Sequence, residues 1–402
     1  MKTRIPYIFL ICLLIASCSS NDMPDLSDIK DDIAQEIDKT LQPEADVVYA
    51  DSEGKDFGVR LKTNVDGKIN VDFRFDGQSE WIEFIETVED FSNPWIPGDI
   101  LHFTSPQHYL HFRTKENTGL GRICRVTVSA EGTDLTSQFV IIQQPRLFDE
   151  EETIAIHNAG TLDVLVGTDK DNIRRVRKLT LTGEMNGLDW SALRTFFYRG
   201  MAMDPSPDAY PVDLDLSAVL SVRGDHTYYS ALGYEPKESG YYVYEDYEIP
   251  DKALERCFNL TGIRLHEKTT KINALALANT NLHSVDIPAG VKEIGDGAFQ
   301  ACANLTEINI PDNSKLQKLG SSVFQGCGTL EHLNLPASLT EMEYNSLIFS
   351  VKEMKVHWPT PPELRVTPVV KDGSVLYVPK GTASLYREAR GWNRFPSIRE
   401  FD

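Results

Sequence analysis

Apolar and polar residues alternate in several segments of 46–145. Ile69, Val71 and Phe73 alternate with polar neighbours, and the same pattern recurs at 124–130. A period of two is typical of β-strands with one buried face, because successive side chains of a strand point to opposite sides. Gly, Asn and Asp residues separate these segments. The sequence therefore predicts an all-β sandwich in this part of the chain.

A longer period governs the second half of the chain. A phrase of the form L-x-x-I-x-I recurs every 21 to 25 residues, beginning at Leu260, Leu282, Leu305, Leu330 and Val351. Between these phrases stand IGDGAFQAC (294–302), LGSSVFQGC (319–327) and a looser IPDKALERC (249–257). One strand per repeat at this period is the signature of a leucine-rich-repeat solenoid, an α/β fold with a parallel β-sheet.

The repeats resemble the BspA-like leucine-rich repeat, whose return segment carries an Ala-Phe pair in place of a long helix. The resemblance covers the regular coils, 249–358. We expect irregular coils over 153–248, with strands near Leu179–Leu181 and Leu214–Leu216, and a C-terminal cap of strand and helix over 359–402. With the five repeat phrases, these segments predict one solenoid whose sheet holds about eight strands.

The first domain, 46–145, is similar to the BACON domain, which is an immunoglobulin-like sandwich. The resemblance rests on a Ser-Glu-Trp-Ile element ending at Ile82, the segment RICRVTVSAEG after Gly119, and a last strand that ends in QQP. The family's name proposes carbohydrate binding, and a spacer role is equally consistent with it. Trp81 enters an apolar strand, so we interpret it as a core residue; an exposed platform for sugar stacking is the alternative.

The first 17 residues have the pattern of an export signal. Lys2 and Arg4 precede an apolar run that is too short to cross ~30 Å of hydrocarbon as a helix. Ile-Ala-Ser ahead of Cys18 resembles the lipobox of bacterial lipoproteins, which implies acylation of Cys18. The acidic segment 18–45 is interpreted as an extended tether. Its first residues, Ser-Ser-Asn-Asp, are similar to segments that place some lipoproteins on the outer face of the outer membrane; an inward-facing lipoprotein is the alternative.

Charge and motifs narrow the functional classes. The chain has 60 acidic and 40 basic residues, a formal net charge of -20, so we expect no nucleic-acid partner. None of the common hydrolase, metalloprotease or nucleotide-binding motifs is present. His102, His108 and His111 suggest a metal site, but residues three apart on a strand point to opposite faces. We therefore expect no catalytic residue, no cofactor and no metal.

Four cysteines remain in the mature chain besides the anchor. Cys257, Cys302 and Cys327 share one position of the repeat, and Cys124 stands alone in the first domain. Residues fixed by a repeat usually point inward, so we expect buried thiols. Whether any of them form disulfides is left open, as is the oligomeric state.

Two groups of residues are candidates for binding. The first consists of the polar positions between the inward apolar ones, which must face outward on the concave sheet: Arg264, Ser284, Asp286, Glu307, Asn309, His332, Asn334, Glu353 and Lys355. The second is a cluster of tyrosines ahead of the regular coils: Tyr228, Tyr229, Tyr234, Tyr241, Tyr242, Tyr244 and Tyr247. Exposed tyrosines anchor partners or stack on sugars; packing between coils is the alternative.

The sequence favours a surface lipoprotein that binds an extracellular protein or another macromolecule through its repeats and uses the first domain as a spacer. Glycan capture, through the first domain or the tyrosine cluster, is the rival hypothesis. A hydrolase whose catalytic residues are scattered over loops is a weaker third.

Overall fold

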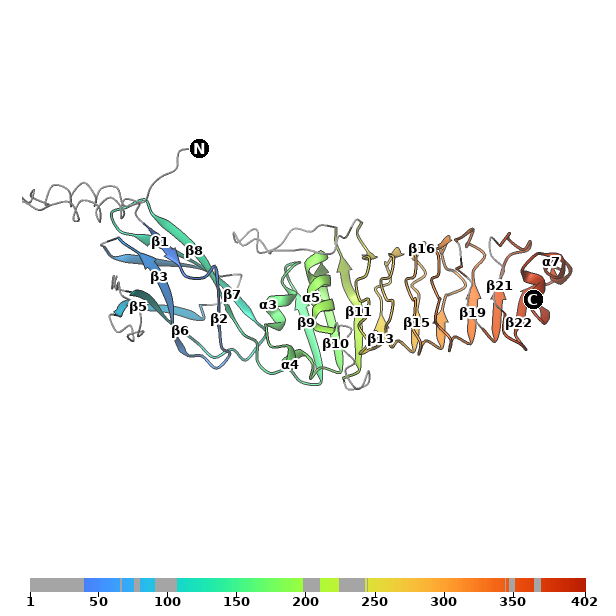
Figure 1. Cartoon of the computed structure of the whole chain (residues 1–402), viewed down its shortest axis with the longest axis horizontal. Coiled ribbons are helices and arrows are strands. Elements are labelled where there is room, and N and C mark those ends of the chain that lie inside the picture. The colour runs from blue at the N-terminus through green and yellow to red at the C-terminus, as the bar shows by residue number, and fades with distance from the viewer. Residues whose placement is uncertain are drawn as a thin grey trace, which may run out of the picture.

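The structure is a computed structural model that describes residues 40–65, 67–75, 80–90, 107–197, 210–223, 243, 245–343, 345–346, 351–364 and 370–402. It has two parts, an N-terminal sandwich and a C-terminal solenoid, which follow one another along the long axis of the molecule (Figure 1). The export signal, Cys18 and nearly all of the predicted tether lie outside the described residues.

Two four-stranded sheets form the N-terminal part. One sheet has the order β1 (Leu41–Pro43), β3 (Asp56–Thr63), β6 (Gln107–Thr114) and β5 (Ile82–Asp90). The other has the order β2 (Val47–Ala50), β8 (Thr136–Gln143), β7 (Arg122–Ala130) and β4 (Ile69–Phe75). Neighbouring strands are antiparallel except β2 and β8. The alternating segments of the sequence therefore form antiparallel sheets.

Aromatic side chains fill the space between these sheets. Phe112 is fully buried at the centre, and its ring lies 5.7 Å from that of Phe57 and 6.1 Å from that of Phe139 on the opposite sheet. Trp81 is 1% exposed and packs edge-on against Phe75 at 6.2 Å. The interpretation of Trp81 as a core residue is confirmed, and the alternative of an exposed platform is wrong, because its ring has no face open to a ligand.

Ten parallel strands of the described chain line one side of the solenoid. Four form a sheet in the order β9 (Glu151–Ile156), β10 (Lys178–Met185), β11 (Val212–Ser221) and β13 (Leu260–Arg264). Six continue it as β15 (Ser284–Asp286), β17 (Glu307–Asn309), β19 (His332–Leu335), β21 (Glu353–Val356), β22 (Val375–Pro379) and β23 (Ser397–Phe401). The His283 N–H donates to the Thr261 carbonyl at 3.2 Å and joins the two sets. The row is visible from β9 to β22 in Figure 1.

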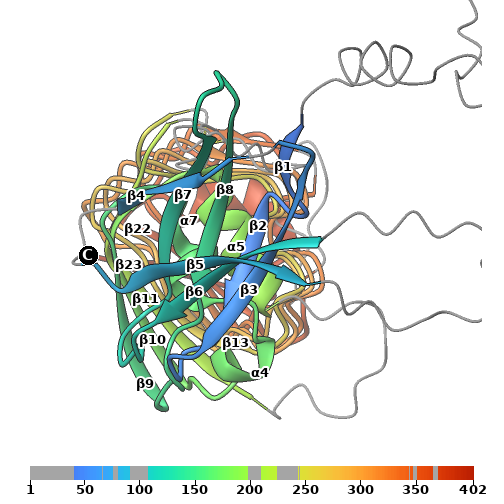
Figure 2. The same ribbon diagram turned by 90° about the vertical axis from the view of Figure 1, so that its left-hand side faces the viewer.

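A second, narrower sheet runs beside the first. It consists of two-residue strands in the order β12 (Glu248–Ile249), β14 (Lys271–Ile272), β16 (Glu293–Ile294), β18 (Lys318–Leu319) and β20 (Glu341–Met342), all parallel. Each strand contributes one inward apolar residue, such as Ile272 or Ile294, both fully buried. Viewed along the long axis, the coils of the solenoid lie behind the strands of the sandwich (Figure 2).

The Ala-Phe return segments are held by hydrogen bonds between coils. Alternate N–H groups of one coil donate to carbonyls of the next at 2.7 to 2.9 Å: Leu275 to Asp296, Leu277 to Ala298, and Asn279 to Gln300. The first and last donors have positive φ, 55° at Leu275 and 56° at Asn279. In the next coil the first position is Gly297, φ 60°, where the lack of a Cβ removes the cost of this backbone conformation.

The interior of the solenoid is one continuous apolar core. Leu282, Leu305 and Leu330 are at most 1% exposed and belong to the same cluster. The described cysteines are buried free thiols, as predicted. At the coil between Cys257 and Cys302 the shared repeat position is occupied by Thr280, whose hydroxyl lies 3.3 Å from the Cys302 Sγ.

Short helices cover the two ends of this core. The N-terminal end carries α3 (Leu162–Val166), α4 (Lys170–Ile173) and α5 (Gly187–Phe197), and the C-terminal end carries α7 (Ala383–Glu388) and the 3₁₀ helix η1 (Trp392–Arg394). Asp189 of α5 is fully buried and accepts hydrogen bonds from the N–H groups of Gly160, Leu162 and Asn186 at 2.5, 2.9 and 2.9 Å. Its carboxylate thus fixes α3 to α5.

The junction between sandwich and solenoid is closely packed. The Gly121 N–H donates to the Leu165 carbonyl at 2.9 Å, and a Cβ at Gly121 would lie 1.8 Å from the Val164 carbonyl oxygen. Arg146 forms a two-pronged ion pair with Glu152 at 2.9 and 3.1 Å. The two parts are therefore joined by direct contacts at a position where the chain requires glycine.

The sequence missed strands at both ends of the solenoid. We expected about eight strands, and the structure has ten because β9 and β23 extend the sheet at its ends. Both stand next to irregular segments, where the repeat phrase has no neighbour to align with.

No helix in the described residues is long and apolar enough to cross a membrane.

Candidate functional site

The outward residues of the long sheet from β13 to β23 form a polar surface, which we call the solenoid face. Its inward residues, among them Val285, Ile308 and Leu333, are 1 to 3% exposed. Side chains alternate across a strand, so the residues between them point outward. The structure thus places the predicted face residues on one side of one sheet.

Strand register aligns these residues in two columns. The first column consists of Ser284, Glu307, His332 and Glu353, which pair in that order across β15, β17, β19 and β21. The second contains Asp286 opposite Asn309, and Asn334 opposite Lys355. It continues to Tyr377 on β22. Arg264 lies at the margin of the face on β13, where it pairs with Asp215 at 3.5 Å.

Hydrogen bonds along the second column fix the two asparagines. The Asn309 Nδ2 donates to the Asp286 Oδ1 at 2.8 Å, and the Asn334 Nδ2 donates to the Asp312 Oδ1 at 3.4 Å. The Asn334 Oδ1 lies 2.9 Å from the His357 Nε2. Each amide is therefore oriented by a neighbouring coil.

The first column is less completely paired. The His332 Nδ1 lies 3.3 Å from the Glu353 Oε2, and the Tyr377 hydroxyl lies 3.5 Å from the Glu353 Oε1. Within the described part of the chain, no hydrogen bond or ion pair occupies the carboxylate of Glu307. Glu307 thus keeps its acceptor capacity for a ligand or water.

A pocket of about 400 Å³ lies in the C-terminal half of the face. It is lined by Glu307, Ile308, Asn309, His332, Leu333, Asn334, Glu353, Lys355, Tyr377 and Phe401. Six of the predicted face residues line it, whereas Ser284, Asp286 and Arg264 do not. The sequence analysis missed Tyr377 and Phe401. Tyr377 stands at the outward position of a strand that we had predicted only as part of the cap, and Phe401 lies on the unpredicted strand β23.

Phe401 closes the pocket at the end of the sheet. The Lys355 Nζ lies 4.4 Å from the centre of its ring, and the His357 ring packs edge-on against it at 5.1 Å. Burial lowers the pKa of the His357 imidazole, so this ring is neutral at neutral pH. Lys355 contributes the ammonium group of the pocket, and Glu307 and Glu353 contribute carboxylates.

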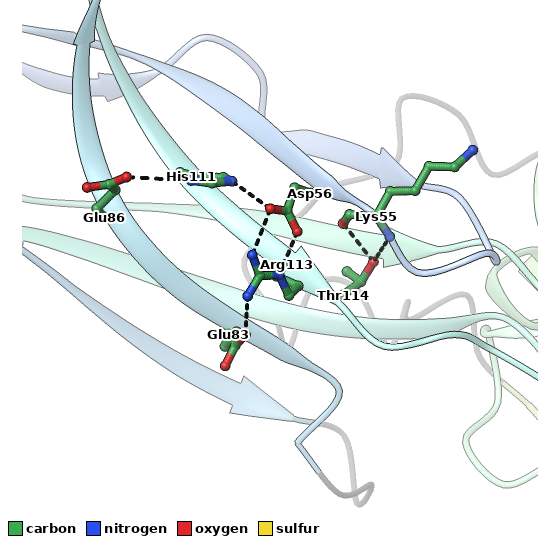
Figure 3. A network of polar contacts seen from close by, with 7 residues as sticks. All are labelled: Lys55, Asp56, Glu83, Glu86, His111, Arg113 and Thr114. Atoms are coloured by element: carbon green, nitrogen blue, oxygen red, sulfur yellow. Dashed lines mark hydrogen bonds and ion pairs between the residues drawn. The ribbon is translucent and has the colours of Figure 1, made fainter.

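The outer face of the N-terminal sheet β1-β3-β6-β5 carries a second group of charged residues, the sandwich network (Figure 3). Arg113 binds both carboxylate oxygens of Asp56, at 2.7 and 2.9 Å, and reaches Glu83 at 3.5 Å. His111 lies 3.3 Å from Asp56 and 4.0 Å from Glu86. The hydrogen bond from Arg113 lowers the pKa of the Asp56 carboxyl. In contrast to Glu307, each charged group of this network is already paired.

The other predicted site residues give little further chemistry. Cys18, His102 and six of the seven clustered tyrosines, all except Tyr247, lie outside the described residues. Tyr247 is half-buried, and its ring stacks with that of His266 at 6.3 Å. Among the residues that the structure describes, no group of three or more His, Cys, Asp or Glu could hold a metal ion.

Comparison with protein families identifies the repeats. Residues 245–353 match the family model described as BspA type leucine rich repeat region, in six copies. The match covers the regular coils that carry most of the solenoid face. A search of curated proteins finds no match.

A comparison with solved structures finds matches to parts of this chain. One is a leucine-rich repeat protein from Bacteroides ovatus ATCC 8483, with 15% identity and a TM-score of 0.24 over 57% of this chain and 61% of that one. Another is the pneumococcal vaccine antigen PcpA, with 13% identity and a TM-score of 0.27 over 65% of each chain. A third is a leucine rich cell surface protein from Faecalibacterium prausnitzii A2-165, with 13% identity and a TM-score of 0.21 over 69% of this chain and 86% of that one. This chain thus spans less than two thirds of the first two proteins.

Proposed function

We propose that this protein is a cell-surface lipoprotein whose solenoid face binds an extracellular macromolecular partner, with a protein surface as the first candidate. The observation that carries the proposal is the polar row of Glu307, His332 and Glu353 beside Asn309 and Lys355, held in register on one sheet. The match of 245–353 to a leucine-rich-repeat family supports a role in interaction.

The size of the face bears on how it binds. Its seven strands from β13 to β23, at ~4.8 Å spacing and with about five residues each at ~3.3 Å, give a surface of ~480 Å². A stable protein complex buries ~800 Å² on each partner. The face alone falls well short of this area, so binding draws on its margins or on many copies displayed on one cell.

The N-terminal half of the chain supplies the anchor and the spacer in this proposal. Cys18 carries the lipid in the outer membrane, the acidic segment 18–45 is the tether, and the immunoglobulin-like, BACON-type sandwich at 46–145 holds the solenoid away from the membrane. The contact of Gly121 with Val164 supports the spacer role, because a tightly packed junction transmits the position of one part to the other.

The function in this proposal is binding without catalysis. The charged groups of the sandwich network are paired with each other, and among the described residues no Ser, Thr or Cys side chain lines the pocket on the solenoid face. A hydrolase would be recognised by turnover of peptide or polysaccharide that one carboxylate substitution abolishes.

The test uses the soluble chain without residues 1–18 on surfaces coated with mucin or with extracellular matrix proteins. Asn309→Arg combined with Asn334→Arg places two bulky cations on the face and is expected to weaken binding at least tenfold while the melting temperature is kept. Glu341→Arg, on the second sheet, is the control and is expected to bind normally. Equal binding by the double variant and the control would contradict the proposal.

Glycan capture, through the first domain or the tyrosine cluster, is the second candidate. It loses one of its platforms, because Trp81 is 1% exposed. Binding of glycans by a chain that lacks 153–402 would favour it over the solenoid face.

A further inference from the structure

The pocket on the solenoid face, which we call the end pocket, differs from the rest of that face in carrying aromatic rings. Tyr377 and Phe401 stand on the adjacent strands β22 and β23 and line it together with polar residues of β17, β19 and β21. Aromatic side chains that remain half-exposed beside polar groups offer apolar contact area at low entropic cost. The pocket therefore suits a ligand with both apolar C–H groups and hydroxyls.

The charges in the end pocket disfavour an ionic ligand of either sign. An anion would lie near the carboxylates of Glu307 and Glu353, and a cation would lie near the ammonium of Lys355, which already covers the Phe401 ring at 4.4 Å. Like charges in a pocket weaken binding because the ligand must also give up its water. A neutral ligand avoids both costs.

The polar groups of the end pocket match hydroxyl groups. Carboxylates only accept hydrogen bonds and the ammonium only donates them, while the amides of Asn309 and Asn334 do both. A hydroxyl both donates and accepts, so adjacent hydroxyls on a ring can use the open Glu307 carboxylate and a neighbouring donor together. Asn309 is oriented for this by Asp286 at 2.8 Å.

The volume sets the size of the ligand. At about 400 Å³ the end pocket lies near the lower limit of small-ligand sites, ~300 to 1,000 Å³. This volume is large enough for one or two sugar rings. From these observations we infer that the end pocket binds a neutral sugar residue of the partner, with Tyr377 and Phe401 contacting the ring and Glu307 and Asn309 holding its hydroxyls. This inference rests on the proposed function, since it assigns the partner's chemistry at the same face.

The experiment measures binding of the soluble chain without residues 1–18 to an array of immobilised neutral, acidic and amino-sugar glycans. Neutral glycans are expected to give the strongest signal. Glu307→Gln and Phe401→Ala are each expected to weaken it at least fivefold, and Glu341→Gln on the second sheet is the matched carboxylate control. Because Phe401→Ala can disturb β23, competition by free glucose, galactose and N-acetylglucosamine is measured on the unchanged protein as well.

The outcomes separate this inference from the proposed function. Absence of signal on neutral glycans, or equal signal from Glu307→Gln and Glu341→Gln, overturns the inference. Suppose that either of these results is found and that the Asn309→Arg, Asn334→Arg variant still loses binding to mucin or matrix proteins. The proposed function is then supported, and only the assignment of a sugar to the end pocket is wrong. Loss of binding after enzymatic deglycosylation of mucin identifies a protein-linked glycan as the source, whereas competition by soluble polysaccharide identifies a free one.

Discussion

The sandwich and the solenoid each present a polar, charged sheet face to solvent, and the two faces differ in how their charges are paired. On the sandwich, Arg113 binds Asp56 through two hydrogen bonds and His111 lies between Asp56 and Glu86. On the solenoid, Glu307 keeps an open carboxylate at a pocket of about 400 Å³. Polarity alone therefore does not identify a binding surface. Polar groups that have no partner and line a pocket are the better indication.

The strands explain part of this difference. The sandwich strands β3, β5 and β6 have eight or nine residues each, so long side chains from three strands meet and pair across the sheet. In the regular coils the face strands have only three to five residues, so each contributes fewer outward side chains than a sandwich strand. Glu307 stands between Ser284 and His332 in its column, so no Lys or Arg lies opposite it.

The largest expected effect separates the two parts by stability. Phe112→Ala removes a fully buried ring at the centre of the sandwich core and should destabilise that domain by ~3 to 5 kcal/mol. The solenoid has its own core and should keep its melting transition and its binding. Differential scanning calorimetry measures the melting transitions of the two parts. Binding to coated surfaces is then measured at a temperature between the two transitions. A single transition that shifts as a whole would show that the sandwich and solenoid unfold as one unit.

The next effect is confined to the N-terminal end of the solenoid. Asp189→Asn keeps the shape of the side chain but turns an NH₂ group toward backbone N–H donors, so we expect a loss of ~1 to 3 kcal/mol in the stability of the solenoid. Chemical denaturation of the variant measures this. A variant as stable as the unchanged protein would show that the carboxylate does not fix α3 to α5.

Asp189 also predicts a pH dependence. Burial raises the pKa of Asp189 to about 6, above the ~3.9 of an aspartate in an unfolded chain. A raised pKa in the folded state means that the proton favours folding, so this contribution is full below pH ~3.9 and is lost as the pH rises through 6. The free energy of unfolding of the unchanged protein should therefore exceed that of Asp189→Asn by a margin that grows as the pH falls from 7 to 4. An advantage that is constant or shrinks over that range would contradict the assignment.

The smallest expected effect is on the sandwich network. Arg113→Leu removes the partner of an exposed carboxylate, and the pKa of Asp56 should then rise toward its ordinary value. Exposed ion pairs contribute little to stability, so the melting temperature should change by about 2 °C or less and binding should be unaffected. NMR titration of the Asp56 carboxyl measures the pKa. A clear loss of binding would make the sandwich network part of the binding surface.

The sequence predicted those features that follow from local period. The inward leucines of the repeat phrases define the strands, so the outward position of Glu307 or Asn334 could be inferred without coordinates. The cysteine positions were likewise predicted as buried from the repeat register. Local pattern was sufficient because each coil contacts only its neighbours.

Features that depend on distant or irregular segments could not be predicted. Phe401 joins the end pocket because β23 pairs with β22, and no repeat phrase marks that strand. The requirement for glycine at Gly121 arises from a carbonyl of α3 more than forty residues further along the chain. The pairing of charges that distinguishes the two faces is also a property of cross-strand register, which periodicity does not encode.

The most direct test of the account is carboxylate footprinting of the soluble chain with and without mucin or matrix protein bound. Carbodiimide labelling followed by mass spectrometry reports the accessibility of each Asp and Glu side chain. The account predicts that bound partner protects Glu307 and Glu353 and leaves Glu83 and Glu86 unchanged. Protection of Glu83 and Glu86, with Glu307 and Glu353 labelled as in the free chain, would contradict it.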